Sequence, residues 1–199
     1  MKLKALLGVS CMSLGVVVHA AGGAAAFSAH SPDLSGGSFE ATFVAKGFGC
    51  EGGNVSPQIS WRNAPQGTQS FAVTMHDPDA PTNVGGFTHW VVVNIPASAN
   101  GLAQGAGNGK LPAPAVGVAN GFDNTGVTGV NGNYGGPCPP QGDKPHRYVF
   151  TVYALGVEDL HAAAGIPKNA SAQVHGFVLN KGLGKGLLGK SSFTATYGR

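Results

Sequence analysis

Two proline-rich segments each bring a histidine to the start of an apolar run. The first, Asp77–Pro81 (Asp-Pro-Asp-Ala-Pro), leads into His89, and the second, Gly136–Pro140 (Gly-Pro-Cys-Pro-Pro), leads into His146 and Tyr148. Proline fixes φ and favours extended backbone at the preceding residue, so such turns hold polar side chains with little freedom. Carboxylates, imidazoles, a phenol and glycine amides that meet at one rim predict a preformed pocket for a small anion.

The two histidines are the strongest candidates for contact with that anion. An imidazole has an ordinary pKa near ~6.5, donates to phosphate or carboxylate oxygens, and donates more strongly when protonated. Tyr148 follows His146 at the spacing that puts both on one face of a strand, so its hydroxyl adds a donor. Arg147 projects to the opposite face, where we expect a structural ion pair. The alternative for each histidine is an ordinary hydrogen-bonded residue at a strand end.

Two aspartates and two glycines have both a functional and a structural interpretation. An Asp before Pro commonly closes an Asx turn, and we assign this role to Asp79. Asp77 ends a hydrophobic strand, and we assign it to orienting a pocket histidine. Gly135 and Gly136 permit close backbone approach, so their N–H groups could bind anion oxygens; a plain tight turn is the alternative.

The same residues allow three classes of function. Two histidines and a carboxylate match a metal-binding triad in composition only, and we expect neither a metal nor another cofactor. An enzymatic alternative is weak hydrolysis of small esters or phosphoesters with His89 or His146 as general base, but no activated nucleophile is visible. A third class is an interaction module that acts through the loops of residues 97–135. We favour a binding protein.

The beginning of the chain has the pattern of an export signal. Two lysines in the first four residues precede the apolar stretch Ala5–Val18, and small residues follow. We expect a signal peptide within residues 1–26, cleaved after Ala20 or Ala26, and a periplasmic or secreted protein. The apolar stretch is shorter than the ~20 residues of a membrane span, so no stable membrane insertion is expected after cleavage.

Composition and cysteine count narrow the class of protein. The chain has 199 residues, 33 glycines, 13 prolines, 11% charged residues and a formal net charge of +3. Without a basic run, nucleic acid is excluded as a partner. The part after the signal, residues 36–199, has the usual size of one domain. In an oxidising compartment Cys50 and Cys138 could form a disulfide; two free buried thiols are the alternative.

The remaining pattern predicts a mainly β fold. Apolar or alternating runs indicate strands at residues 38–45, 59–61, 70–76, 89–95, 146–155 and 193–197. Short helices are expected at residues 159–164 and from Asn169 or Ser171 to about residue 180. Without regular βαβ alternation, we infer antiparallel sheets with a few peripheral helices. Residues 97–135 carry little regular pattern and are expected to form a long surface excursion around the pocket.

These segments together resemble the phosphatidylethanolamine-binding protein family, which includes the Raf kinase inhibitor proteins, and its bacterial branch in particular. Both proline-rich segments, with the His-Trp-Val-Val and His-Arg-Tyr motifs that follow them, agree with the family in order and spacing. So does the run from Gly49 through Trp61. The resemblance spans about Phe39 to Tyr197.

The resemblance implies a β-sandwich with a large central antiparallel sheet, a smaller second sheet and C-terminal helices. It also implies a small pocket for phosphate-type anions and phospholipid head groups. By motif, the lining would consist of Asp77, His89, His146 and Tyr148, with walls from Pro81, Gly136 and Pro137. Further expectations are Phe87 at a position often held by tryptophan, Tyr134 and Tyr197 at the mouth, and a cis peptide bond before Pro81.

One departure from the family limits what the resemblance implies. The C-terminal helix that borders the pocket in animal members is replaced here by residues 181–199, so kinase inhibition is not carried over. The leading expectation is therefore an exported binding protein with an anion pocket, which could modulate or inhibit a protein partner of unknown identity. A homodimer is left open.

Overall fold

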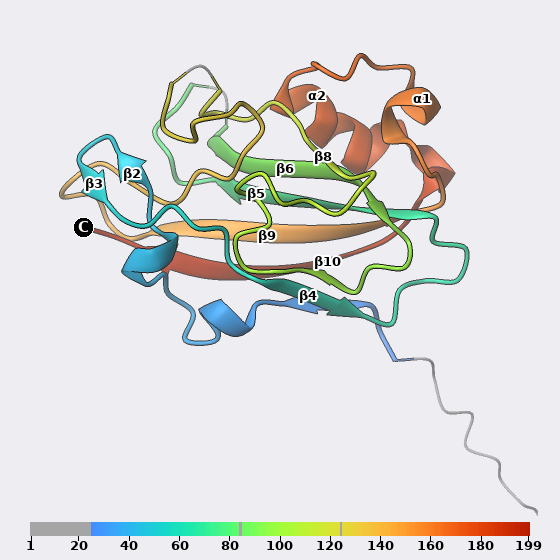
Figure 1. The fold of residues 1–199 in the computed structure, drawn as a ribbon, viewed down its shortest axis with the longest axis horizontal. Coiled ribbons are helices and arrows are strands. Elements are labelled where there is room, and N and C mark those ends of the chain that lie inside the picture. Colours follow the sequence, from blue (N-terminus) through green and yellow to red (C-terminus); the bar gives the residue numbers. More distant parts are fainter. Residues whose placement is uncertain (1–24, 84, 124) are drawn as a thin grey trace, which may run out of the picture.

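The fold is a large twisted antiparallel sheet with a smaller sheet on one face and short helices on the other (Figure 1). The computed structural model describes residues 25–83, 85–123 and 125–199. Residues 1–24, which hold most of the expected signal peptide, lie outside the described residues.

Short strands come first, the long strands follow from β5 onward, and the helices lie late in the chain. The strands are β1 (Ser28–His30), β2 (Lys46–Gly47), β3 (Cys50–Glu51), β4 (Ile59–Arg62), β5 (Ser70–Asp77), β6 (Phe87–Pro96), β7 (Gly101–Leu102), β8 (Val116–Gly117), β9 (His146–Leu155) and β10 (Leu187–Tyr197). The helices are α1 (Leu160–Ala164) and α2 (Ala172–Phe177), the latter continued by a π-helical turn at Val178–Gly182. Single 3-10 turns occupy Pro32–Leu34, Ala41–Phe43 and Gly184–Gly186.

The large sheet has the strand order β10-β9-β5-β6-β8, and its neighbours are antiparallel throughout. Strands β1, β4 and β7 form the smaller sheet, and β2 and β3 form a hairpin. The central strands β5, β6 and β9 are buried along most of their length, which explains their nearly continuous apolar runs. The expected mainly β fold, with a central antiparallel sheet and a smaller second sheet, is confirmed.

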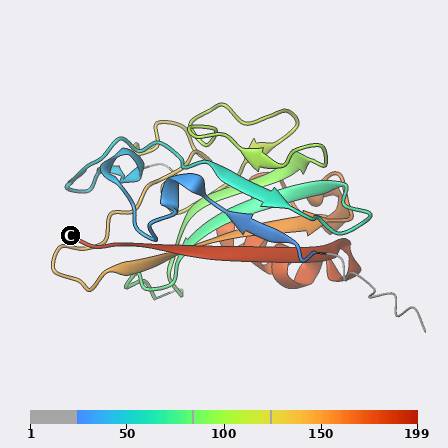
Figure 2. The ribbon, with the colours of Figure 1, turned by 90° about the horizontal axis from the view of Figure 1, so that it is seen from below.

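Side chains of β5 enter two hydrophobic cores on opposite faces of the large sheet. Phe71 and Met75 face the smaller sheet, where Phe71 packs on Trp61 at 5.1 Å between ring centroids. Ala72 belongs to the second core, together with Leu160 of α1. This alternation follows from the two-residue period of a strand. Figure 2 shows the same layering from below, with the helices gathered at the end of the sheet away from the C-terminus.

The expected strand at residues 38–45 is wrong. Its centre forms the single 3-10 turn Ala41–Phe43, and Ser38 makes only an isolated bridge to Thr196. Phe39, Phe43 and Ala45 are buried as the alternation predicts, but Ala41 is exposed and Val44 is buried. The backbone carbonyls accept hydrogen bonds from residues 52–55 of the following loop, so the alternating pattern predicted neither the full burial nor the hydrogen-bonding partner.

The C-terminal elements are as expected, except that the last strand is longer. β10 begins at Leu187 because its first residues already pair with the end of β9. Both expected helices are confirmed, and both have side-chain caps. Asp159 accepts from the N–H groups of His161 and Ala162, and Ser171 accepts from the N–H of Val174. No helix within the described residues is long and apolar enough to cross a membrane.

Candidate anion-binding site

The antiparallel order of the sheet explains why distant segments meet at one end of the molecule. β5 ends at Asp77, and its neighbours β6 and β9 begin at Phe87 and His146. In the register, Asp77 lies opposite Phe87, and His76 lies opposite Val149 of β9. The two proline-containing turns therefore lie side by side at this end of the sheet.

A pocket of about 420 Å³ lies at this end of the sheet. It brings together Asp77, His89, His146 and Tyr148, with exposed fractions of 2%, 4%, 2% and 0%. Pro81 also lines it, as expected. The rest of the lining is mostly apolar and consists of Phe48, Ala80, Thr82, Phe87, Gly121, Phe122, Thr125, Cys138, Pro139 and Pro140. The pocket thus has a polar floor and an apolar rim.

Asp77 fixes the orientation of the His146 ring. His146 Nδ1 donates to Asp77 Oδ2 at 2.7 Å. The other carboxylate oxygen, Oδ1, accepts from the N–H groups of Asp79 at 2.8 Å and Ala80 at 3.0 Å. Asp77 therefore closes the turn and holds the histidine at the same time. His146 Nε2 remains for a ligand, with the partly exposed Asp143 Oδ2 at 3.5 Å.

His89 is held from the opposite wall of the pocket. Its Nδ1 donates to the carbonyl oxygen of Gly135 at 3.0 Å. Burial lowers the pKa of His89 from 6.5 to about 4, against the opposing effect of the Gly135 carbonyl. The ring is thus neutral at pH 7, with its proton on Nδ1. No described residue bonds Nε2, which is left as an acceptor for a protonated ligand oxygen.

Tyr148 presents a buried hydroxyl next to the Asp77 carboxylate. The side chain is fully buried, and its hydroxyl forms no hydrogen bond of ordinary length with a described residue, although it interacts with Asp77 at longer range. Burial and the nearby Asp77 carboxylate raise the pKa of this hydroxyl, so it keeps its proton. Leaving such a group unpaired costs about 1–3 kcal/mol. A ligand oxygen that accepts from Tyr148 would remove this cost.

Asp79 and Arg147 lie just outside the pocket and pair with each other. The Asp79 carboxylate accepts from Arg147 Nε at 2.9 Å, from its terminal guanidinium nitrogen at 2.8 Å and from its backbone N–H at 2.9 Å. These bonds hold the pKa of Asp79 well below its usual range. The expected ion pair of Arg147 is confirmed. The expected turn role of the Asp79 side chain is wrong, because Asp77 closes that turn.

Gly136 and Pro137 lie behind the pocket and are not among the residues that line it. The Gly136 N–H donates to the side-chain oxygen of Asn54 at 2.8 Å, and the Pro137 carbonyl accepts from Ala45 at 3.2 Å. The Gly135 N–H is also occupied, by the His89 carbonyl. The expected amide nest is therefore absent at these two glycines, and the plain structural interpretation holds. A side chain at Gly136 would collide with backbone, which explains the glycine.

Three further expectations about the mouth are corrected. Tyr134 is fully buried and donates to the Phe43 carbonyl at 2.9 Å, so it supports the core. Tyr197 is half-buried at the end of β10 and is not in the lining. The described residues contain a cis bond at Ala113–Pro114 but none before Pro81, where the Asp77 carboxylate already sets the turn. Phe87, by contrast, does line the pocket.

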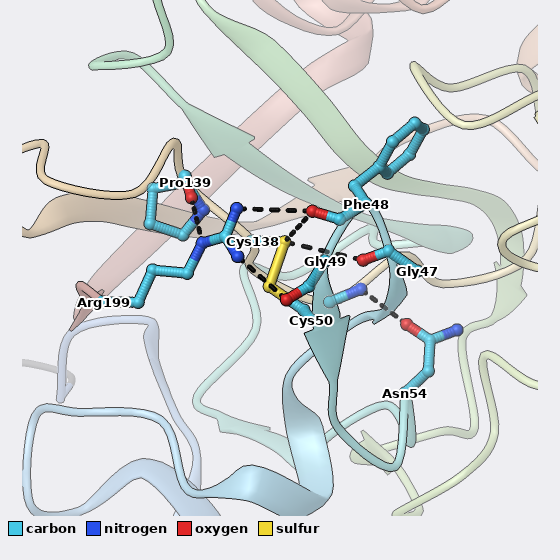
Figure 3. Close-up of a disulfide and its surroundings, with 9 residues drawn as sticks. Gly47, Phe48, Gly49, Cys50, Asn54, Cys138, Pro139 and Arg199 are labelled. Carbon is cyan, nitrogen blue, oxygen red and sulfur yellow. Dashed lines mark hydrogen bonds between the residues drawn. A yellow bond between two sulfur atoms is a disulfide. The ribbon is translucent and has the colours of Figure 1, made fainter.

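The apolar rim includes residues that the sequence did not indicate. Phe48 is 61% exposed at the tip of the β2–β3 hairpin, and its φ of 51° is rare for a residue with a side chain. Phe122, from the irregular segment after β8, packs edge-on against His89 and Phe87. The disulfide Cys50–Cys138 is present and joins the hairpin to the proline-rich wall (Figure 3).

A larger depression of about 750 Å³ lies beside this pocket and shares Thr82, Phe87 and Gly121 with it. Its lining includes amide, hydroxyl and lysine side chains but neither His89 nor His146. The convergence of buried titratable groups marks the smaller pocket as the candidate site.

Comparison with known proteins finds a matching family model and several similar proteins. The profile of the phosphatidylethanolamine-binding protein family matches residues 35–194. The protein YbcL of Escherichia coli (strain K12) is 45% identical over 161 residues, or 79% of this chain and 81% of that protein. The crystal structure of YbcL matches with a TM-score of 0.74 at 41% identity, covering 88% of this chain and 99% of that one. A Mycobacterium tuberculosis protein named as a lipoprotein, LppC, is 36% identical over 138 residues, 63% of this chain and 60% of that protein.

Proposed function

The chain belongs to the phosphatidylethanolamine-binding protein family, and we propose that its pocket binds a small phosphate-type anion, either free or as a phospholipid head group. The observation that carries this proposal is a set of three polar atoms on the pocket floor that form no close hydrogen bond with a described residue, the nearest carboxylate to His146 Nε2 being Asp143 at 3.5 Å. These are the Tyr148 hydroxyl, His146 Nε2 and His89 Nε2. They come from β6 and β9, the two strands that flank β5, and both histidine rings are held in place through Nδ1.

The three atoms complement a phosphate that carries one proton. The Tyr148 hydroxyl donates to one oxygen. His89 is neutral, so its Nε2 accepts from the protonated oxygen or takes up that proton on binding. His146 Nε2, oriented through Asp77, donates to a third oxygen when the ring is protonated. The ligand thereby pairs with buried polar groups that form no close hydrogen bond with a described residue.

The apolar rim supports an organic phosphate over a bare one. A phosphate monoester that places its phosphate on the floor would place its organic group between Phe48 and Pro139. Burial of such apolar surface contributes about 25 cal/mol per Å². Inorganic phosphate and phenyl phosphate, compared side by side, separate the contribution of the floor from that of the rim.

Isothermal titration calorimetry with both ligands tests the proposal. His146→Ala should abolish measurable binding; it should also lower the melting temperature, because the buried Asp77 carboxylate loses its partner, so the titrations are run well below the melting temperature of the variant. His30→Ala, at an exposed position of β1, is the matched control and should bind normally. Wild-type protein that binds neither ligand, or a His146→Ala variant with unchanged affinity, would contradict the proposal.

We also propose that the protein is exported. Support comes from the Cys50–Cys138 disulfide, the signal-like pattern in residues 1–26 and the name of the LppC relative. Fractionation of cells that express the full chain should recover the processed protein outside the cytoplasm. Unprocessed protein in the cytoplasmic fraction would refute export.

Modulation of a protein partner is a further proposal that rests on the same pocket. Pull-down from an extract of the exported fraction, with wild type and His146→Ala as baits, measures whether capture depends on the pocket. A partner that both baits retain equally would place the interaction elsewhere on the protein.

The Asp77–His146 pair favours one second candidate, a weak hydrolase. A histidine whose Nδ1 donates to a buried carboxylate leaves Nε2 free to act as a general base toward water. The test is release of p-nitrophenol from its acetate and phosphate esters. Activity that exceeds the His146→Ala background would support hydrolysis, and equal rates would remove it.

A further inference from the structure

Arg199 joins two segments of the pocket rim through their backbone carbonyls. Its Nε donates to the carbonyl oxygen of Pro139 at 2.7 Å. Its two terminal nitrogens donate to the carbonyl oxygens of Gly49 at 2.9 Å and Phe48 at 3.3 Å. Figure 3 shows the guanidinium between the hairpin and the proline-rich wall, next to the disulfide. One planar group thus spans both segments.

These bonds act on the residues that shape the rim. Phe48 and Pro139 both line the pocket, and they stand on opposite segments. The disulfide ties Cys50 to Cys138 through their side chains, whereas the guanidinium bonds the backbone carbonyls beside them. A guanidinium, with donors in a rigid fork, fixes the direction of those carbonyls. Gly49 permits the approach, because a Cβ there would lie 3.2 Å from the guanidinium.

The guanidinium also keeps an unpaired charge beside the pocket. All three of its acceptors are neutral carbonyls, and no described carboxylate forms an ion pair with it. Arg147, by comparison, is paired with Asp79. A positive charge without a counter-charge attracts an anion over a range set by the ionic strength.

We infer that Arg199 is a positioning residue of the pocket, which holds the apolar rim in shape and adds attraction for an anionic ligand. This inference rests on the proposed anion binding. It predicts that Arg199 makes two separable contributions to ligand affinity. The attraction depends on charge alone, whereas the rim depends on the three-way fork that lysine cannot reproduce.

The test compares Arg199→Lys and Arg199→Ala with two probes, inorganic phosphate and phenyl phosphate. Inorganic phosphate reaches only the floor, so Arg199→Lys should bind it as the wild type does. Arg199→Ala should bind inorganic phosphate about twofold to threefold more weakly than the wild type at low salt, and this difference should disappear at high salt. Phenyl phosphate also contacts the rim. Both variants should therefore lose about tenfold in affinity for it, because their rim must be ordered on binding.

A readout without ligand accompanies the titrations. Amide hydrogen exchange in residues 46–51 and at Cys138, Gln141 and Gly142 should accelerate in both variants and remain unchanged in the large sheet. Arg62→Ala is the charge-matched control. Arg62 lies on β4, where its Nε donates to Ser28 Oγ, and this variant should preserve both affinities and both exchange rates.

Three results would overturn the inference. The first is an Arg199→Lys protein that binds phenyl phosphate as the wild type does. The second is an equal loss for both probes together with faster exchange throughout the molecule, which would indicate a general stability role. The third is a wild type that binds neither probe, which would overturn the proposed function and the inference with it. The first two leave the proposed function intact.

Discussion

Asp77 and His146 are 69 positions apart in the sequence, and their side chains meet at 2.7 Å in the floor of the pocket. The same carboxylate caps the turn that follows β5. One buried side chain therefore couples the shape of a turn to the orientation of a candidate ligand-binding histidine. Replacement of Asp77 should reveal both roles.

Asp77→Asn should lower anion affinity about tenfold at neutral pH. The amide keeps an oxygen for the turn, but it removes the negative charge that orients the imidazole and balances its charged form. The measurement is a calorimetric titration with inorganic phosphate. Asp79→Asn is the matched control, because it breaks the outer pair with Arg147 and leaves the floor intact. Equal losses in the two variants would contradict the account.

Tyr148→Phe should separate binding from stability. The variant keeps the ring, which packs edge-on against His89 and Phe39, and removes a buried hydroxyl that forms no hydrogen bond of ordinary length with a described residue. The free energy of unfolding should stay constant or rise by about 1 kcal/mol. Phosphate affinity should fall about tenfold. A destabilised variant with normal affinity would mean that the hydroxyl has a structural partner.

The buried His89 should make the protein sensitive to mild acid. Its pKa in the folded protein is about 4, below the ordinary 6.5, because burial disfavours the charged ring. The unfolded chain therefore takes up the proton first. The contribution of neutral His89 to the free energy of unfolding is complete above pH 6.5 and declines as the pH falls toward 4. It amounts to on the order of 3 kcal/mol.

Urea unfolding of wild type and His89→Gln between pH 7 and pH 4 measures this contribution. The difference in unfolding free energy between the two proteins should change with pH in the stated direction, since glutamine does not titrate. If the unfolding free energies of the two proteins change with pH in parallel, His89 is not the titrating group.

Loss of the disulfide should destabilise the protein and loosen the rim. Cys50 and Cys138 close a loop with a sequence separation of 88. On the chain-entropy account the crosslink contributes up to about 4 kcal/mol. The Cys50→Ser/Cys138→Ser double variant should therefore unfold at lower urea concentration. A reducing agent should lower the urea midpoint of the wild type by the same amount and leave the midpoint of the double variant unchanged. A change in the midpoint of the double variant would point to another cause.

The parts of the site that sequence could predict are those fixed by local chemistry. Apolar runs that end at Asp77 and begin at His89 and His146, each next to a proline-rich turn, were enough to place the polar floor. The two-residue spacing of a strand put Tyr148 on the same face as His146. These inferences needed only backbone geometry and an antiparallel sheet.

The parts that sequence could not predict depend on contacts between distant loops. The segment at residues 38–45 alternates like a strand, yet its backbone bonds to a neighbouring loop. Gly136 resembles an anion-binding amide, but Asn54 takes its N–H. Phe48 reaches the rim because its hairpin is tied to the proline-rich wall by a disulfide and by Arg199. No local pattern encodes these pairings.

The most direct test of the pocket is a histidine ring NMR spectrum recorded during titration with inorganic phosphate. The Nε2 resonances of His89 and His146 should shift together along one saturation curve, because a single ligand contacts both rings. His30, exposed on β1, should remain in place. Phosphate that leaves both pocket histidines unshifted, or that shifts all three rings alike, would contradict the account.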